Sequence, residues 1–351
     1  MKLHQLTFTR FFAAIAIVVY HFGASIPPFN EGPLHEFFSR ANVFVSFFFI
    51  LSGFVMVIAY SKSKANAIDY GNYYVNRLAR IYPLYFIALL AVVLIKPHHI
   101  DFKGVLTQAL LIQSWIPGYP LRLNYPGWSL SVEAFFYLTF PFIFNYIFKR
   151  CKLWISTIGV LVVYVIIHYI IYQALNSEFY KGPHTNSHDL LFYFPVSNVG
   201  EFLLGCLLGL WFLKIPAKYF KPYDFVVIGF FLLTLWLIEA GVNFIFISPL
   251  FTLIILFLSL NTGFITRLFS KKVFVSLGEI SYGVYILQVP VFGYLAFFNS
   301  KLHILSKHGS FYVGFGLLIL VSYLAYEILE RPLSNYIKAA YGRRKALQKI
   351  N

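Results

Sequence analysis

The chain has 351 residues, of which 59% are hydrophobic and only 12% are charged, and its mean hydropathy is +0.72. Charged residues supply about a quarter of an ordinary soluble chain, so this composition excludes a soluble protein. The aromatic content of 21% excludes a disordered chain, and two cysteines, Cys151 and Cys206, are too few for a disulfide scaffold. We therefore expect an all-α polytopic membrane protein.

Ten apolar runs approach the length of about 20 residues that a membrane-spanning helix needs. They cover residues 7–26, 42–60, 78–95, 128–148, 153–175, 198–213, 224–240, 243–260, 280–298 and 311–331. The first run lacks a small-residue cleavage site and carries two ionisable residues, so we do not interpret it as a signal peptide. The runs predict one transmembrane domain over residues 1–335, with about ten helices, followed by a short basic cytoplasmic tail over residues 336–351.

The distribution of Lys and Arg predicts the orientation of these helices. If all ten runs cross the membrane, 21 of the 28 cations lie in the tails and the even-numbered loops. Positive charge gathers on the cytoplasmic side, so we expect both termini there and a multi-pass protein of the inner (cytoplasmic) membrane. The same bias accounts for the isoelectric point of 9.6 through contact with membrane lipid, and we expect no nucleic-acid partner.

Two ionisable residues inside the first run are the first candidate site. Arg10 and His21 are eleven residues apart, which at 100° per residue returns them to nearly the same helix face, ~16 Å apart along the axis. Charged groups are costly in lipid, so such residues indicate function. The alternatives are a packed core histidine and an arginine whose guanidinium reaches the inner headgroups.

A second candidate lies at the cytoplasmic entrance of the third run. Arg77 and Arg80 are three residues apart and are therefore neighbours on a helix. Two guanidinium groups suit a phosphate-bearing ligand from the cytoplasm, because each binds phosphate through two hydrogen bonds. The alternative is a pair of topology anchors that contact lipid headgroups.

The fourth run opens with Trp128, which fits the outer interfacial belt, and with Ser129 or Ser131 as a helix cap. Glu133 follows near the positive end of the helix dipole. A carboxylate bound to one nitrogen of His21 would fix its tautomer and raise its basicity. The alternative for Glu133 is a capping carboxylate.

Other polar residues in the runs have weaker claims. Glu201 lies near the outer end of the sixth run and is a candidate to line the same cavity, while Gly205 and Gly209 form a small-residue face suited to helix packing. His168 fits a core histidine with a satisfied hydrogen bond. The outer stretch from His184 to Asp189 lacks enough ligands for a metal, so we expect none.

Six motifs in order resemble the acyltransferase-3 family of bacterial integral-membrane acyltransferases along nearly the whole chain. They are a basic residue followed after ten residues by histidine (Arg10, His21), FF-x-LSGF (Phe48 to Phe54), R-x-x-R-I-x-P (Arg77 to Pro83), W-S-L-S-V-E (Trp128 to Glu133), LGEISY (Leu277 to Tyr282) and ERP (Glu330 to Pro332).

The resemblance implies transfer of an acyl group, usually acetyl, from cytoplasmic acyl-CoA to a hydroxyl of an exported or cell-surface glycan or glycolipid. It implies an essential His21, with Arg10, Arg77 and Arg80 associated with the donor. No cofactor is expected to be tightly bound, and acyl-CoA serves as co-substrate.

Three departures from the family pattern limit this reading. Ala134 stands where many members carry a second acidic residue, and Gln288 stands where a histidine is common. A mechanism with two carboxylates or a second histidine is therefore not expected. Many relatives also append a soluble domain for acceptor handling, so we expect the membrane domain to act alone or with a partner protein.

The mechanism that we expect places the phosphates of acyl-CoA on Arg77 and Arg80 and the acyl-bearing arm beside Ser52 and Gly53. His21 acts as general base on the acceptor hydroxyl, or a covalent acyl intermediate forms first. The candidates for acceptor binding or for the cavity are Arg122, Tyr125, Trp128, Ser131, Glu201 and Tyr282. The main alternative is an exporter or flippase of a polysaccharide or lipid-linked intermediate, and a second alternative is a non-catalytic scaffold.

Overall fold

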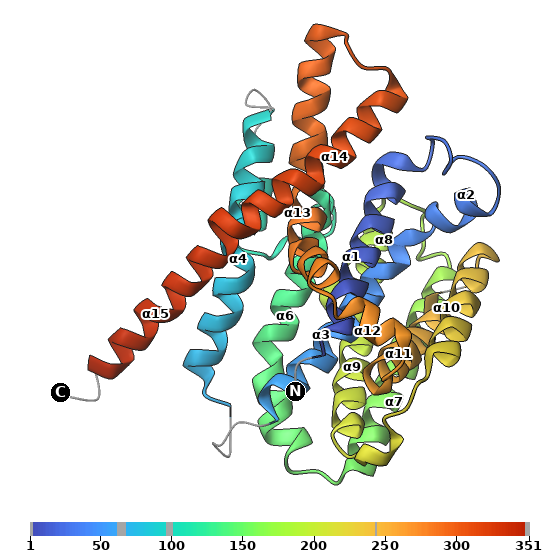
Figure 1. Ribbon diagram of the computed structural model, residues 1–351, viewed down its shortest axis with the longest axis vertical. Coiled ribbons are helices and arrows are strands. Elements are labelled where there is room, and N and C mark those ends of the chain that lie inside the picture. Colours follow the sequence, from blue (N-terminus) through green and yellow to red (C-terminus); the bar gives the residue numbers. More distant parts are fainter. Residues whose placement is uncertain (1–2, 62–67, 96–100, 243, 348–351) are drawn as a thin grey trace. The chain divides into compact units, whose positions relative to one another are not determined.

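The computed structural model describes residues 3–61, 68–95, 101–242 and 244–347, which form helices joined by short connections (Figure 1). Within these ranges the single β-type pairing is an isolated bridge between Lys221 and Asn261. The prediction of an all-α protein is confirmed. The α-helices are α1 (Gln5–Val18), α2 (Gly32–Phe38), α3 (Phe44–Tyr60), α4 (Tyr70–Ile95), α5 (Phe102–Ala109), α6 (Trp128–Phe142), α7 (Leu153–Leu175), α8 (Asn186–Phe192), α9 (Val199–Phe212), α10 (Asp224–Glu239), α11 (Phe244–Leu260), α12 (Phe264–Phe269), α13 (Lys272–Leu302), α14 (Lys307–Ala325) and α15 (Arg331–Leu347).

Eight helical stretches of the described chain are long and apolar enough to cross a membrane. Each overlaps one of the predicted runs, so the prediction of a polytopic membrane protein is confirmed. The stretches are Gln5–Gly23, Ala41–Tyr60, Tyr70–Ile95, Tyr125–Phe148, Leu153–Leu175, Asn186–Phe212, Lys272–Leu302 and Lys307–Lys345.

The predicted number of about ten spans exceeds these eight because two runs form shorter helices. The runs 224–240 and 243–260 correspond to α10 and α11, which have 16 and 17 residues. Helices of this length reach about 25 Å, short of the ~30 Å hydrocarbon core. The two pack against each other, and the outer face of α10 is apolar, with Phe225 91% and Trp236 61% exposed.

The helices form two compact units. The first unit comprises Met1–Lys62 and Arg150–Tyr285, and the second comprises Ser63–Lys149 and Ile286–Asn351. Residues 272–285 of α13 belong to the first unit and the rest of that helix belongs to the second.

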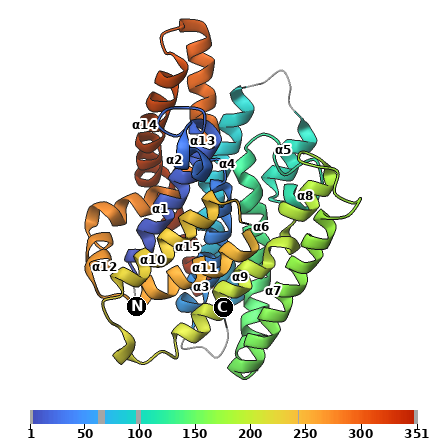
Figure 2. The ribbon, with the colours of Figure 1, turned by 90° about the vertical axis from the view of Figure 1, so that its right-hand side faces the viewer.

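Close packing of α3 against α9 organises the first unit. A Cβ atom on Gly205 would lie 1.9 Å from the carbonyl oxygen of Ile50, and one on Gly53 would lie 2.1 Å from that of Phe202. Gly209 likewise faces Val57, so the predicted packing role of the two glycines of α9 is confirmed. Helix α7 runs along α9 in the same unit (Figure 2).

A polar clasp fixes the start of α12 in the first unit. The carboxylate of Asp224 accepts hydrogen bonds from the backbone N–H groups of Phe264 and Ile265 at 2.7 and 2.9 Å. It also accepts a bond from the amide of Asn261 at 2.8 Å. Because Asp224 begins α10, the clasp joins the first turns of α10 and α12, and it satisfies N–H groups that a helix start leaves open.

In the second unit, α15 packs along α4 (Figure 1). Lys345 forms an ion pair with Asp69, and the hydrogen bond from its ammonium lowers the pKa of Asp69. The boundary predicted at residue 335 therefore falls inside a helix. Ile337 and Tyr341, four residues apart, are half-buried, and this partly apolar stripe explains why a basic segment packs on α4.

We expect Gly205→Ala to destabilise the first unit. The added methyl must displace the backbone of Ile50, and overpacking of this kind costs about 1–3 kcal/mol. A lower thermal unfolding midpoint of the purified protein in detergent is the measurement. Gly159→Ala in α7 is the matched control, because nothing lies within 4 Å of its added Cβ and alanine favours the helix by about 1 kcal/mol. Equal midpoints for the two variants would contradict the packing role.

Candidate active site

His21 lies in a single π-helical turn, Val19–Gly23, that continues α1. Its side chain is exposed, and the ring of Tyr20 lies 4.8 Å from its own in an edge-on arrangement. Isolated π-turns are rare and are frequent at functional sites. The geometry therefore suits a histidine that meets a substrate better than it suits the alternative of a packed core residue.

Arg10 lies in the regular part of α1 and is half-buried. The predicted common face for Arg10 and His21 assumed 100° per residue, but the wider turn that begins at Val19 rotates His21 by part of a turn from that position. A one-turn change of helix type cannot be read from hydrophobic spacing. The association of Arg10 with the donor stays a prediction.

The structure corrects the interpretation of Gly53. We expected Ser52 and Gly53 to admit the acyl-bearing arm of the donor, but the space beside Gly53 is occupied by the backbone of α9 at Phe202 and Cys206. Gly53 therefore serves helix packing. Ser52 is half-buried, and its predicted contact with the donor stays a prediction.

His168 and Glu201 form a buried pair between α7 and α9. The imidazole Nε2 lies 3.0 Å from Glu201 Oε1, and the two side chains are 3% and 2% exposed. Nδ1 donates to the carbonyl oxygen of Tyr164 at 2.8 Å, so both ring nitrogens of His168 have partners inside the unit. The interpretation of Glu201 as a residue that lines an open cavity is therefore wrong, and His168 is the satisfied core histidine that was predicted.

In the second unit, Glu133 belongs to a polar cluster. The Tyr137 hydroxyl, one turn further along α6, donates to its carboxylate, and the guanidinium of Arg77 lies 5.6 Å from the centre of the Tyr137 ring. Helices α4 and α6 are held in this register by a hydrogen bond from the Tyr74 hydroxyl to the carbonyl of Leu138 at 3.0 Å. Tyr137 therefore contacts both Glu133 and the Arg77 side chain within this unit.

Two further cations complete this cluster. Arg80, one turn beyond Arg77, is exposed, and Lys338 of α15 interacts electrostatically with both arginines. Arg77, Arg80 and Lys338 thus bring three cations together near Glu133, which suits an anion with several negative charges. We call Arg77, Arg80, Lys338, Tyr137 and Glu133 the cationic cluster.

Sequence reasoning missed Lys338 and gave Tyr137 no role. Lys338 lies in the segment that was interpreted as a cytoplasmic tail, and only the packing of α15 on α4 brings it to the two arginines. Tyr137 carried a usable signal, because it lies four residues after Glu133 and residues at this spacing are neighbours on a helix.

Ser131 is a structural residue and not an acceptor-binding one. It is fully buried, its hydroxyl donates to the carbonyl of Leu111 at 2.7 Å, and it accepts from the backbone N–H of Ser114 at 3.3 Å. Neither Ser131 nor Ser129 caps α6, which begins after Gly127 without a side-chain cap. The hydroxyl instead ties α6 to the connection that follows α5.

Arg122 lies on an exposed aromatic platform. Its guanidinium pairs with Asp101 and stacks 4.6 Å from the centre of the Tyr119 ring, and the ammonium of Lys103 lies 5.0 Å from the same ring. The backbone N–H of Gly104 and then Arg122 lower the pKa of Asp101, so the pair stays ionised at neutral pH. The platform therefore offers charged hydrogen-bond donors for a polar ligand.

The remaining acceptor candidates are Tyr125, Trp128 and Tyr282, and all three are half-buried. Tyr125 and Trp128 lie at the start of α6 in the second unit, whereas Tyr282 lies on α13 in the first. The predicted contact of Glu133 with His21 would join the two units, and it stays a prediction. In the part of the chain that the structure describes, no group of three His, Cys, Asp or Glu residues is arranged to hold a metal ion.

We expect the His168 and Glu201 pair to tolerate Glu201→Gln, because the amide N–H can donate to Nε2 while Nδ1 keeps its bond to Tyr164. Glu201→Leu removes the carboxylate that meets the buried Nε2 and should cost about 1–3 kcal/mol of stability. Thermal unfolding in detergent measures both variants. A Leu variant as stable as the Gln variant would contradict the assignment of this hydrogen bond.

Comparison with known proteins identifies the family of this chain. A family model described as an acyltransferase domain matches residues 3–327. The chain is similar to the acyltransferase MdmB of Streptomyces mycarofaciens, with 30% identity over 227 residues that cover 60% of this chain and 57% of that protein. It is also similar to the O-acetyltransferase OatA of Staphylococcus aureus, with 25% identity over 332 residues that cover 83% of this chain and 50% of OatA.

The chain thus spans about half the length of these two relatives. No solved structure matches it. Since the family model covers nearly all of the chain, including Arg10, His21, the arginines of α4 and Glu133, the protein belongs to the acyltransferase-3 family of membrane proteins.

Proposed function

We propose that this protein transfers an acyl group, usually acetyl, from cytoplasmic acyl-CoA to a hydroxyl of an exported or cell-surface glycan or glycolipid. The observation that carries the proposal is the match to an acyltransferase domain over residues 3–327. The O-acetyltransferase OatA supports acetyl as the group and a hydroxyl as its destination. The inner membrane is the proposed location, because acyl-CoA is a cytoplasmic donor.

The cationic cluster supports coenzyme A as the carrier of the acyl group. Coenzyme A bears several phosphates, and Arg77, Arg80 and Lys338 supply three positive groups within one unit. Guanidinium groups bind phosphate through paired hydrogen bonds, and the ammonium adds a compact point charge. Glu133 and Tyr137 keep Arg77 oriented through its contact with the tyrosine ring.

The proposed chemistry is direct transfer with His21 as general base. The imidazole takes the proton from the acceptor hydroxyl, and the oxygen attacks the thioester carbonyl carbon. The carbon–sulfur bond breaks, the new ester forms, and the thiolate takes the proton from the imidazolium to leave as a thiol. General-base assistance is worth about 10²–10⁴-fold in rate.

The platform at Tyr119 is the proposed contact for the acceptor. Arg122 and Lys103, which lie over the tyrosine ring, can donate hydrogen bonds to the hydroxyl groups of a sugar. We also propose that a partner protein assists in acceptor handling.

We expect His21→Ala to abolish acyl transfer, with a loss of at least 10²-fold, because the general base is removed. The readout is mass spectrometry of the surface glycan from a deletion strain that expresses the variant. The glycan should be intact but lack the acyl mass. His308→Ala, which changes an exposed histidine of α14, is the matched control and should restore acylation.

Two other outcomes would refute this function. Loss of the glycan itself on gene deletion would favour an exporter of a polysaccharide or lipid-linked intermediate. Full rescue of acylation by His21→Ala would favour a non-catalytic scaffold.

We expect Lys338→Gln to raise the KM for acyl-CoA about fivefold with little change in kcat, because it removes one of three cations that bind the phosphates. The double variant Arg77→Gln with Arg80→Gln should raise the KM for acyl-CoA more than tenfold, since hydrogen bonds to charged groups contribute about 1.5–3 kcal/mol each. Steady-state kinetics in detergent at varied acyl-CoA measures both.

Arg343→Gln is the control for Lys338→Gln, because Arg343 is an exposed cation of the same helix. It should leave the KM for acyl-CoA unchanged. An equal effect of the two substitutions would assign the loss to general surface charge and not to the cationic cluster.

A further inference from the structure

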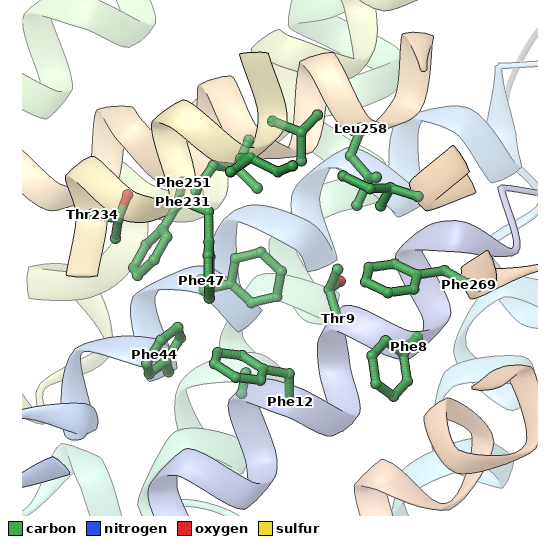
Figure 3. A pocket seen from close by; sticks show the side chains of 15 residues that line it. Phe8, Thr9, Phe12, Phe44, Phe47, Phe231, Thr234, Phe251, Leu258 and Phe269 are labelled. Atoms are coloured by element: carbon green, nitrogen blue, oxygen red, sulfur yellow. The ribbon is translucent and has the colours of Figure 1, made fainter. Parts of the chain in front are cut away.

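The first unit contains an apolar cavity of about 230 Å³ that the proposed acyl transfer does not use (Figure 3). It lies among α1, α3, α10, α11 and α12, and phenylalanine rings form most of its wall. Figure 3 shows Phe8 and Phe12 of α1 on one side and the rings of Phe231 and Phe251 on another. An engineered cavity of about 150 Å³ with a similar lining binds benzene, so this one has room for a longer hydrocarbon segment.

Fifteen residues line the cavity, and two of them carry polar side-chain groups. The Thr9 hydroxyl donates to the carbonyl of Leu6 at 2.8 Å, and the Thr234 hydroxyl donates to that of Phe230 at 2.7 Å. Both donors are thus used within their own helices. A buried water needs two to four polar partners, which this lining does not supply, so the cavity suits a hydrocarbon better than water.

The cavity is open at two of its lining residues. Phe12 is 37% exposed and Ile228 is 43% exposed. Phe12 lies within the first candidate membrane span, and Ile228 lies on α10, whose exposed face carries Phe225 and Trp236. In a membrane this surface faces acyl chains, so lipid can supply the hydrocarbon.

Three exposed cations lie close in sequence to residues that line the cavity. Arg267 lies on α12 between the lining residues Ile265 and Phe269, and Lys271 and Lys272 follow after Ser270. The carboxylate of Asp224 accepts the clasp from α12 and also interacts electrostatically with Arg267, so the three cations outnumber this carboxylate. An anionic headgroup is therefore the complementary partner for this end of the cavity.

The cavity lies away from Arg10, the residue of α1 that is expected to bind the acyl donor. Phe8, Thr9, Phe12 and Ala13 line it, and at 100° per residue they share one face of the helix. Arg10 does not line it and projects from another side of α1. The occupant is therefore distinct from the acyl donor.

We propose that this cavity binds one hydrocarbon chain of an anionic phospholipid from the bilayer, with the lipid phosphate on Arg267, Lys271 and Lys272. The chain fills the phenylalanine-lined space and the headgroup stays at the membrane surface beside α12. A phosphate without a chain lacks the apolar contact and should not bind.

Native mass spectrometry of the delipidated full-length protein tests this with three probes. Phosphatidylglycerol should bind, phosphatidylcholine with identical chains should bind more weakly, and glycerol phosphate should not bind. Arg267→Gln, Lys271→Gln and Lys272→Gln should each weaken phosphatidylglycerol about fivefold, because a cation near an anionic lipid surface contributes about 1 kcal/mol. Arg343→Gln and Arg344→Gln in α15 are the charge-matched controls. Equal binding of the two phospholipids would overturn the headgroup assignment.

Ala13→Leu tests the chain site, because Ala13 is buried in the wall and the larger side chain occupies the space. We expect at least a tenfold loss of phosphatidylglycerol binding with an unchanged elution profile. A photoreactive phosphatidylglycerol with its label near the chain end gives a readout on the unaltered protein. Label on peptides of α1, α10 or α11 supports the proposal, and label confined to the second unit overturns it. Displacement of the label by long-chain acyl-CoA, but not by unlabelled phosphatidylglycerol, would assign the cavity to the donor and would also overturn it.

Discussion

The hydrocarbon core of a membrane supplies no hydrogen-bond partners, so each polar side chain within a span must find one inside the protein. This chain meets the constraint in two ways. Thr9 and Thr234 donate to carbonyl groups of their own helices. His168 instead reaches Glu201 on the neighbouring helix. The first solution leaves a helix surface apolar, and the second fixes two helices together, so polar residues in these spans shape the protein before they perform any chemistry.

Close helix packing has consequences beyond the helices that contain the glycines. Gly53, Gly205 and Gly209 allow α3 and α9 to approach until backbone atoms meet. Helix α3 also contacts α1 and α11, and its Phe44 and Phe47 form part of the cavity wall. The position of α3 against α9 therefore helps to define the space that we assign to a lipid chain. Gly53, within the FF-x-LSGF motif, therefore serves this packing and not the donor.

Apolar runs predicted the helices well because a helix that crosses a membrane needs a long segment of apolar residues. Eight of the ten runs match helices of spanning length. Side-chain roles were harder to predict. The π-turn at His21 rotates the residues after Val18 around the helix axis without a change in hydrophobicity. The hydroxyl of Ser131 donates a hydrogen bond to the carbonyl of Leu111, which lies in a distant loop. The pairing of Glu201 depends on which face of α9 meets α7. None of these features follows from local spacing, because each depends on the relative rotation of packed elements.

The cations show why a charge count cannot separate anchors from ligand sites. The positive-inside bias is a property of whole loops, and it predicts the same location for Arg267, Arg343 and Lys338. Packing distinguishes them. Lys338 is brought to Arg77 and Arg80 because α15 lies along α4, and Arg267 stands between two residues that line an apolar cavity. A cation becomes a recognition site where the fold places it beside other cations or beside a space that fits the rest of the ligand.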